Sequence, residues 1–566
     1  FWLKAFCSDQ QSLATGAPKN HPQTSRSGSA SIAAMDNEIA STESEDIMAH
    51  AFSMEEDILR GVMLHKTLLN MGEVWRLRPN KNAGKMRFYN LSGKVDQIDY
   101  FLSHSWASSG FMKYVALLLN FHNMPYIHAV IIGLTAATII EVAGYSVWPY
   151  PFSIARLGSK EGQWWLDRDG VLTMDLGMTY YLIPCLVCAF VMHIVPICPW
   201  WREKTSVFLD QVCIHQVDPD LKKKGIFSLG GFLRCSTCMR VLWSPPYLSR
   251  LWCVFEMAAF QYINPDRMLY FAPVFNECLY FAFFWFNFWH VAYFQCIMHF
   301  KLGGDTFSGL AQLIGFIPGL YFGLQFVRLY QHTKAQIPLQ LRTFDCTRAN
   351  CFAQEDRKFV EAAIQEWYGS TDDFNEFVRV DMKQGIVSDA GDGLAWHCFI
   401  SCSVPHIFQH FDVLAACFKT EDDTADAHTI LNIALVTIVR ELGQAPFIFH
   451  NIIDASTLLP RRVNRCAERL MTWVLTCWTF AIFMVTALVV NESYHFHWAA
   501  VIIVGCGWIP IVYKTYGCRG RNKLTVKKSQ VTLRREEANR KKKEAEEAAI
   551  AAGEPIPVDD RGKDKY

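Results

Sequence analysis

The sequence has little charge: only 19% of its 566 residues are Asp, Glu, Lys or Arg, whereas 51% are hydrophobic. Because an ordinary globular domain carries about a quarter charged residues, this deficit indicates a chain that contacts a lipid bilayer. The 54 basic and 54 acidic side chains leave no excess of either sign. A dedicated nucleic-acid-binding domain has a basic excess, so nucleic acid is not expected as a partner.

The chain also lacks a complete zinc-binding motif, although it contains 19 cysteines. Cys235 and Cys238 form a Cys-x-x-Cys unit, but no second unit follows at a matching distance. Structural zinc usually has four protein ligands. We therefore expect reduced, buried thiols, with no metal site and no bound cofactor.

The two ends of the sequence lack apolar runs. Residues 1–45 are rich in Ser, Ala, Gln and Asn. That composition cannot bury enough apolar surface to offset the chain entropy, so we expect a disordered N-terminal segment. Residues 516–566 are rich in Lys and Glu, and we interpret them as a basic and charged cytosolic tail.

Long apolar segments lie between these ends. About 20 predominantly apolar residues cross a hydrocarbon core. Six segments have this character: 127–148, 175–199, 276–299, 307–329, 470–490 and 496–515. They predict three transmembrane hairpins, at 127–199, 276–329 and 470–515.

A further apolar segment, 396–450, is interrupted by Asp412, Arg440 and Glu441. We interpret it as amphipathic or membrane-associated, and a fourth hairpin is the alternative. Basic residues cluster in the stretches between the hairpins, whereas the turn at 491–497 has none. Because basic loops stay in the cytosol, we expect a multi-pass integral membrane protein whose soluble parts and C-terminus are cytosolic. The basic run at 514–528 favours contact with anionic lipid.

Short apolar strands alternate with helices in the remaining stretches. Strands are expected at 98–103, 206–209, 240–243 and 267–272, and helices at 112–121, 227–233 and 251–260. This alternation predicts a parallel sheet with helices on both faces. Ligands bind at the carboxyl ends of such strands, where Ser103, Asp210 and Ser244 fall.

Several of these stretches resemble the Toll/interleukin-1 receptor (TIR) family. The strings DYFLSHSW, VFLDQVCIHQ and VLWSPPYLSRLWCVFE begin at residues 99, 207 and 241. They are similar to that family's first strand, second strand, and third strand with the helix that follows. The most specific part is the spacing Trp252-Cys253-x-x-Glu256. The string from Cys351 to Ser370 resembles the family's closing helix.

The resemblance implies an α/β fold with a flavodoxin-like parallel sheet of TIR type. Its parts are a first strand and helix at 85–126, a central part at 201–274 and a closing helix region at 340–385. Here the predicted transmembrane hairpins interrupt the fold. The resemblance also implies self-association through this domain.

Glu256 is the candidate catalytic residue. In TIR domains that cleave NAD, a glutamate on the helix after the third strand is catalytic, and Glu256 matches that position. It is also the one carboxylate of an apolar helix, where burial is costly unless the group is paired or functional. Partial burial would raise its pKa and suit it to work at a ribosyl centre. Alternatively, Glu256 pairs with Arg250 or Arg240 and only holds the helix.

The candidate nucleotide-binding residues are Ser103, His104, Trp106, Asp210, Ser244 and Trp252. The resemblance places Ser103, His104 and Trp106 in a loop that lines the nucleotide pocket, although a simple turn at the end of a strand is equally compatible with them. Asp210 matches an acidic residue that more often organises its loop than does chemistry.

Three functions remain open from the sequence. The first is a membrane-anchored TIR signalling protein that hydrolyses NAD, with NAD as substrate and Glu256 as catalyst. The second is a non-enzymatic TIR adaptor that acts by self-association. The third, less favoured, is a channel or transporter with a cytosolic regulatory domain.

Overall fold

The computed structural model describes residues 58–121, 123–155, 171–194, 204–264, 267–300, 304–351, 354–382, 396–419, 456 and 464–493. The segment 1–45, the last expected span 496–515 and the tail 516–566 lie outside these ranges. Most of 396–450 lies outside them too. The expectations for those parts of the chain, including the contact with anionic lipid, therefore stay predictions.

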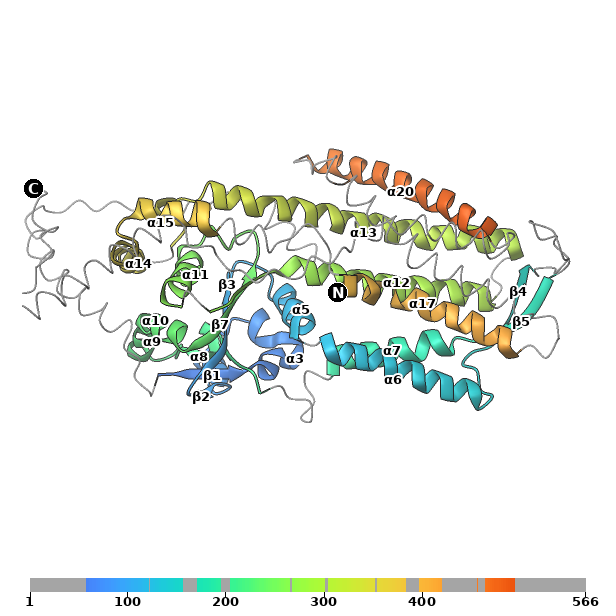
Figure 1. The fold of residues 1–566 in the computed structure, drawn as a ribbon, viewed down its shortest axis with the longest axis horizontal. Coiled ribbons are helices and arrows are strands. Elements are labelled where there is room, and N and C mark those ends of the chain that lie inside the picture. The colour runs from blue at the N-terminus through green and yellow to red at the C-terminus, as the bar shows by residue number, and fades with distance from the viewer. Residues whose placement is uncertain are drawn as a thin grey trace, which may run out of the picture.

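A six-stranded sheet lies at one end of an elongated molecule (Figure 1). Its strand order is β2-β1-β6-β3-β7-β8. The strands are β1 (Arg60–Met63), β2 (Gly93–Lys94), β3 (Ile98–His104), β6 (Ser206–Phe208), β7 (Ser236–Trp243) and β8 (Leu269–Pro273). The strands expected at 98–103, 206–209, 240–243 and 267–272 are thus present, with shifted ends.

The predicted flavodoxin-like parallel sheet is wrong, because the sheet is mixed and most of the described chain is helical. β3 pairs in parallel with β6 and β7, and β7 pairs in parallel with β8. However, β1 is antiparallel to both β6 and β2. These two short strands, of which β2 is at the edge of the sheet, precede the first expected strand, and the apolar runs of the sequence gave no sign of them.

Shorter helices from distant parts of the sequence surround the sheet, and some of them pack on other helices rather than on the strands. They are α3 (Leu64–Arg76), α4 (Asn82–Tyr89), α5 (Gly110–Phe121), α8 (Asp210–Cys213), α9 (Pro219–Phe227), α10 (Leu229–Arg234), α11 (Leu251–Ile263), α14 (Gln354–Tyr368) and α15 (Thr371–Phe377). A 3₁₀ turn at Cys346–Arg348 and a π-helical turn at Val378–Met382 flank the last two. α14 packs on α11, where Phe255 stacks on Trp367 with ring centroids 5.1 Å apart.

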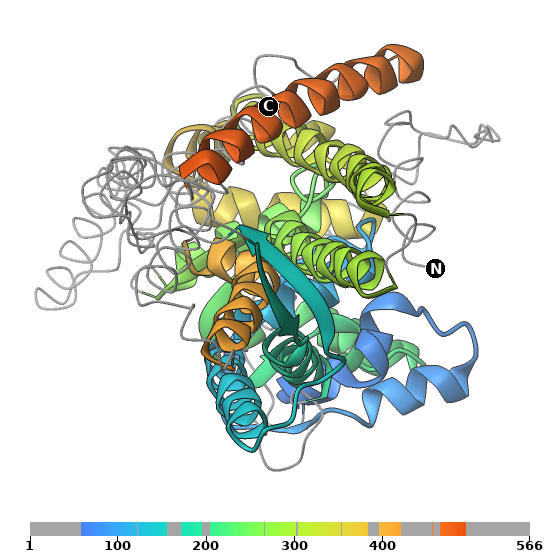
Figure 2. The same cartoon turned by 90° about the vertical axis from the view of Figure 1, so that its right-hand side faces the viewer.

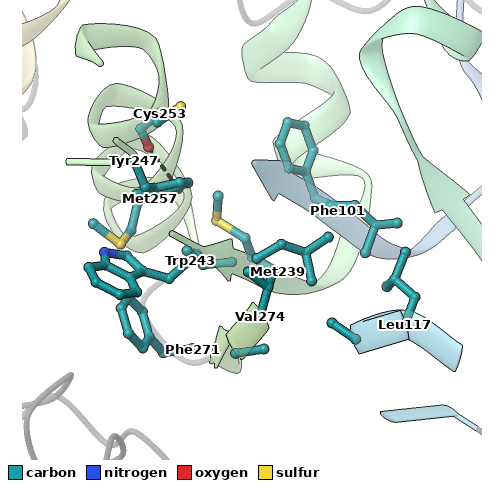
Figure 3. Close-up of a cluster of buried hydrophobic side chains, with 14 of the residues drawn as sticks. Phe101, Leu117, Met239, Trp243, Tyr247, Cys253, Met257, Phe271 and Val274 are labelled. Atoms are coloured by element: carbon teal, nitrogen blue, oxygen red, sulfur yellow. Dashed lines mark hydrogen bonds between the residues drawn. The ribbon is translucent and has the colours of Figure 1, made fainter. Parts of the chain in front are cut away.

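The central strands are buried on both faces, as their apolar runs require. Five consecutive residues of β7, Met239–Trp243, are buried. Phe101 of β3 stacks on Phe208 of β6 at 4.6 Å between ring centroids. Figure 3 shows Phe101, Met239 and Trp243 within one apolar cluster beneath α11. This packing fixes the positions at which β3, β6 and β7 end.

Long helices extend away from the sheet (Figure 1). They are α6 (Asn123–Val142), α7 (Thr179–Ile194), α12 (Val274–Phe300), α13 (Gly304–Arg342), α17 (Trp396–Lys419) and α20 (Arg465–Ser493). The hairpin of β4 (Tyr150–Ala155) and β5 (Val171–Leu176) lies at their far end. Seen along the bundle, α20 lies on the outside of α13 (Figure 2). Since β8 runs directly into α12, the bundle and the sheet are continuous.

The predicted transmembrane hairpins, and with them the multi-pass membrane localisation, are wrong. Helices do occupy five of the six expected spans, but none in the described ranges is long and apolar enough to cross a bilayer. The channel or transporter alternative, which assumed these spans, stays a prediction.

Candidate functional site

The candidate site lies where β3 and β6 end. Ser103 and His104 are the last residues of β3, and Asp210 comes two residues after β6, at the start of α8. Because β3 and β6 are parallel neighbours, their carboxyl ends meet at the same edge of the sheet. Register pairs Phe101 with Phe208, so the chain brings Ser103 and Asp210 out on the same edge.

Glu256 reaches this edge from α11 and contacts Ser103. Its Oε2 lies 2.6 Å from Ser103 Oγ, and the same Oγ lies 2.6 Å from the hydroxyl of Tyr247. The Tyr247 hydroxyl in turn donates to the backbone oxygen of Cys253, at 2.9 Å. The last bond is drawn in Figure 3.

The surroundings of Glu256 favour its neutral form. The pKa of Glu256 is raised to about 8, chiefly by burial; a hydrogen bond donated by Ser103 opposes the rise, and the Asp210 charge adds to it. The side chain is nonetheless only partly buried, so a ligand at the surface can reach it. The alternative of an ion pair is not observed in the described residues. Arg240 instead lies over the Phe121 ring, 4.3 Å from its centroid, and Glu256 has Ser103 as its hydrogen-bond partner.

Trp106 and Asp210 form the second half of the site. The indole Nε1 of Trp106 donates to Asp210 Oδ2 at 2.7 Å, and the backbone N–H of Gln211 also donates to this carboxylate. Burial raises the pKa of Asp210, while these two hydrogen bonds and the charges of Lys113 and Arg78 oppose the rise. Trp106, in the loop after β3, and Gln211, in α8, thus hold the Asp210 carboxylate in a fixed orientation.

Two cations lie against the Trp106 ring. Arg78 Cζ is 5.1 Å from the ring centroid and Lys113 Nζ is 5.0 Å from it. Arg78 also donates to the backbone oxygen of Trp106 at 2.7 Å. Cations over an indole face are attracted by its ring quadrupole, and they give this part of the site a positive field.

A cavity of about 240 Å³ opens beside Trp106. It is lined by Arg78, Pro79, Lys85, Trp106, Asp210, Gln211 and Gln216. Drug-sized ligands usually occupy roughly 300–1,000 Å³, so this cavity holds part of a dinucleotide rather than all of it. An aromatic face, two cations and a carboxylate together suit a base, phosphates and ribose hydroxyls. Ser103 and Glu256 do not line the cavity.

His104 belongs to the wall behind the site. Its ring packs edge-on against Trp75 and Trp106, with centroid distances of 5.1 and 4.5 Å. Burial and then the Lys113 charge lower the pKa of His104 well below its usual value, so its imidazole is neutral. A neutral, buried imidazole supports Trp106 but offers no charge to a ligand.

Ser244 and Trp252 are not brought to the cavity. Ser244 is buried at the end of β7, and its backbone oxygen accepts the Tyr247 N–H at 2.8 Å. Trp252 lies on the face of α11 that meets α14, where its Nε1 donates to Asp356 at 3.1 Å and its ring stacks on Phe359. Trp252 therefore fastens the closing helix and takes no place in the cavity.

Sequence reasoning missed four residues of the site: Arg78, Lys85, Lys113 and, as a partner of Glu256, Tyr247. Arg78 and Lys85 precede β3 in a polar stretch without strand character. Lys113 is fully buried in an otherwise apolar helix. A lone lysine in an apolar helix was the one signal available in the sequence, because a lysine that becomes buried requires a partner.

No group of three or more His, Cys, Asp or Glu side chains within the described ranges is arranged to hold a metal ion. Cys235 and Cys238 are free thiols. Comparison with protein-family models, with curated proteins and with solved structures gave no match. The resemblance to TIR domains therefore rests on the residues quoted above.

Proposed function

We propose that this chain is a TIR-like signalling protein that binds a dinucleotide beside Trp106 and hydrolyses NAD with Glu256. The observation that carries the proposal is Glu256 itself, a partly buried carboxyl whose pKa is raised in part by the charge of Asp210, and Asp210 lines a cavity that has an aromatic face and two cations. Strongly shifted carboxyls near a cavity are typical of functional sites.

The reaction is cleavage of the bond between nicotinamide and ribose by water. NAD⁺ and water give ADP-ribose, nicotinamide and a proton. The nicotinamide ring is already cationic and departs neutral, so it needs no proton from an acid. An ionised carboxylate beside the ribose stabilises the positive charge that develops on the sugar. The ionised form of Glu256 is therefore the active one.

The cavity supplies binding for the other part of the dinucleotide. A base stacks on the Trp106 ring once Arg78 moves off it. Arg78 and Lys85 are then free to contact the phosphates, and Asp210 accepts ribose hydroxyls. The ribosyl centre lies toward Ser103 and Glu256, beyond the cavity itself.

To test the proposal, the purified full chain is incubated with NAD, and the release of nicotinamide is measured by chromatography. Glu256→Gln keeps the size of the side chain and its contact with Ser103 but removes the ionisable group. We expect the rate to fall by at least about 100-fold, as for the loss of one group that stabilises the charge of a transition state. Glu361→Gln is the matched control, because Glu361 is a partly exposed carboxylate on α14 paired with Arg357, and it should leave the rate unchanged. A Glu256→Gln protein with the wild-type rate would rule out this mechanism.

A non-enzymatic adaptor is the second candidate. It is favoured by one observation, that neither Ser103 nor Glu256 lines the cavity. In that case the domain binds nucleotide and self-associates without cleaving it. The same preparation distinguishes the two, since an adaptor binds NAD in calorimetry and returns it intact.

A further inference from the structure

The hydrogen-bond chain around Glu256 contains more contacts than the hydroxyl groups have protons. Three consecutive contacts join Glu256 to Ser103, Ser103 to Tyr247, and Tyr247 to a backbone oxygen, at 2.6, 2.6 and 2.9 Å. Each contact of this length requires one proton between its heavy atoms. A serine and a tyrosine hydroxyl supply one proton each.

The donor in each of these hydrogen bonds can be deduced in turn, starting from the backbone oxygen of Cys253. The Cys253 backbone oxygen has no proton, so Tyr247 must donate to it. Tyr247 then has only lone pairs left for Ser103, and Ser103 must donate to Tyr247. Ser103 in turn has only lone pairs left for Glu256. The third proton has one possible source, the carboxyl group.

From this count we infer that Glu256 is held as a neutral carboxylic acid that donates to Ser103, and that Tyr247 is the positioning residue that keeps it so. We call this hydrogen-bond chain of Glu256, Ser103 and Tyr247 the latch, because it holds the proposed catalyst in its protonated form. Ionisation of Glu256 requires Ser103 to turn its proton to the carboxylate, and one of the other two contacts is then lost. The claim that these hydrogen bonds regulate NAD cleavage rests on the proposed function, but the proton count does not.

The groups around the carboxyl agree with the count. From α8, the charge of Asp210 disfavours a second negative charge. From α11, burial raises the pKa of the Cys253 thiol well above its usual value, and from the loop before α11 it does the same for the Tyr247 hydroxyl, so both are neutral. Arg250 and Lys113 act on Cys253, whereas no cation among the described residues contributes to the titration of Glu256.

A cationic ligand opens the latch. The nicotinamide ring of NAD carries the positive charge that the protein withholds from Glu256. When it arrives, it favours the carboxylate, Ser103 turns to donate to Glu256, and the active form appears only with substrate present. A dinucleotide whose nicotinamide ring is uncharged does not favour the carboxylate and leaves the acid protonated.

The test is a pH titration of Glu256 by infrared difference spectroscopy on the full chain without nucleotide. The carbonyl band of a protonated carboxylic acid is assigned to Glu256 by its loss in Glu256→Gln. In the wild-type protein we expect this band at pH 7 and its disappearance near pH 8, where the pKa lies. Absence of the band at pH 7 overturns the inference, whatever the protein does to NAD.

Two variants test the hydrogen-bond chain, because they should shift the pH at which the carbonyl band disappears in opposite directions. Tyr247→Phe frees Ser103 to donate to the carboxylate, so the band should disappear about one pH unit lower, the equivalent of one hydrogen bond. Ser103→Ala removes the donor that the ionised form needs, so the band should persist to higher pH.

Tyr181→Phe is the matched control, because Tyr181 is equally buried and its hydroxyl bonds the backbone oxygen of Phe288 in the helical bundle. It should leave the titration unchanged. Shifts of the same sign in Tyr247→Phe and Ser103→Ala contradict the latch. If both follow the expected signs while nicotinamide is never released, the latch stands and the proposed activity is wrong.

Discussion

At the scale of single residues, burial and a neighbouring charge act on Glu256 in the same direction. Removal from water disfavours the carboxylate, and the charge of Asp210 adds to this effect. A hydrogen bond donated by Ser103 to the carboxylate is the one opposing influence, and Ser103 can give it only when it no longer donates to Tyr247. A carboxyl whose pKa is raised to about 8 is mostly protonated at neutral pH, and this state determines how the proposed reaction depends on pH.

The pH dependence of NAD cleavage follows with a definite sign. Below pH 8 the acid form of Glu256 dominates, and the active carboxylate increases about tenfold for each pH unit. We expect kcat/KM for NAD to rise with pH and to level off above about 8. Initial rates from pH 6 to 9.5 measure this in the free enzyme. A rate that falls over this interval would mean that the protonated acid is the catalytic form.

The sequence predicted only part of this site. The strand ends at Ser103 and Asp210 and the spacing that marks Glu256 were readable, because short apolar runs and their polar ends are local patterns. The partner Tyr247 and the cations over Trp106 were not, since they come together only through the packing of α5 and α11 on the sheet. Trp252 shared the motif of Glu256, but it lies one turn earlier on α11, where its ring and its Nε1 contact α14.

At the scale of elements, one helix is capped by another. The backbone N–H groups of Tyr180 and Tyr181, in the first turn of α7, donate to the two carboxylate oxygens of Asp412 at 2.7 and 2.8 Å. Asp412 belongs to α17 and is buried. The first N–H groups of a helix have no partner within it, so this carboxylate satisfies two of them across an interface.

Replacement of Asp412 by Ala is expected to destabilise the fold by roughly 1–3 kcal/mol, because two buried donors lose their acceptor. Asp412→Asn keeps an acceptor oxygen and should cost less. Asp218→Ala is the matched control, since Asp218 caps its own helix α9 through two N–H groups at an exposed position. Urea unfolding of the three variants compares them. Equal losses at Asp412 and Asp218 would show that the interhelical cap has no special weight.

The same aspartate shows why hydropathy misjudged the long helices. Asp412 interrupts an apolar run and indicated a segment at a surface, yet it is buried against α7. The runs at 276–299 and 307–329 correctly predicted helices. Sequence averages do not reveal which polar side chains find partners inside a bundle, and so an apolar helix and a membrane span look alike over short windows.

At the scale of the whole molecule, the sheet and the helical bundle are joined by continuous elements. β8 runs into α12, and α13 returns along the bundle to the residues before α14, which covers α11. α20 is fastened to the outside of α13 by a buried ion pair. Arg328 Nε and Nη2 contact the two carboxylate oxygens of Glu468 at 2.9 and 2.8 Å. Such a bidentate pair fixes both the register and the orientation of the two helices.

Removing one partner of this pair should destabilise the assembly of α20 on α13 by roughly 3–5 kcal/mol, because a buried charge is left uncompensated. Glu468→Ala tests this by equilibrium unfolding. The double variant Arg328→Met with Glu468→Leu should recover most of the loss, since well-packed apolar residues can replace a buried pair. Disrupting the exposed pair of Arg348 and Asp345 by Arg348→Ala should change stability by less than about 1 kcal/mol. If Glu468→Ala costs no more than this surface variant, the ion pair does not hold α20 in place.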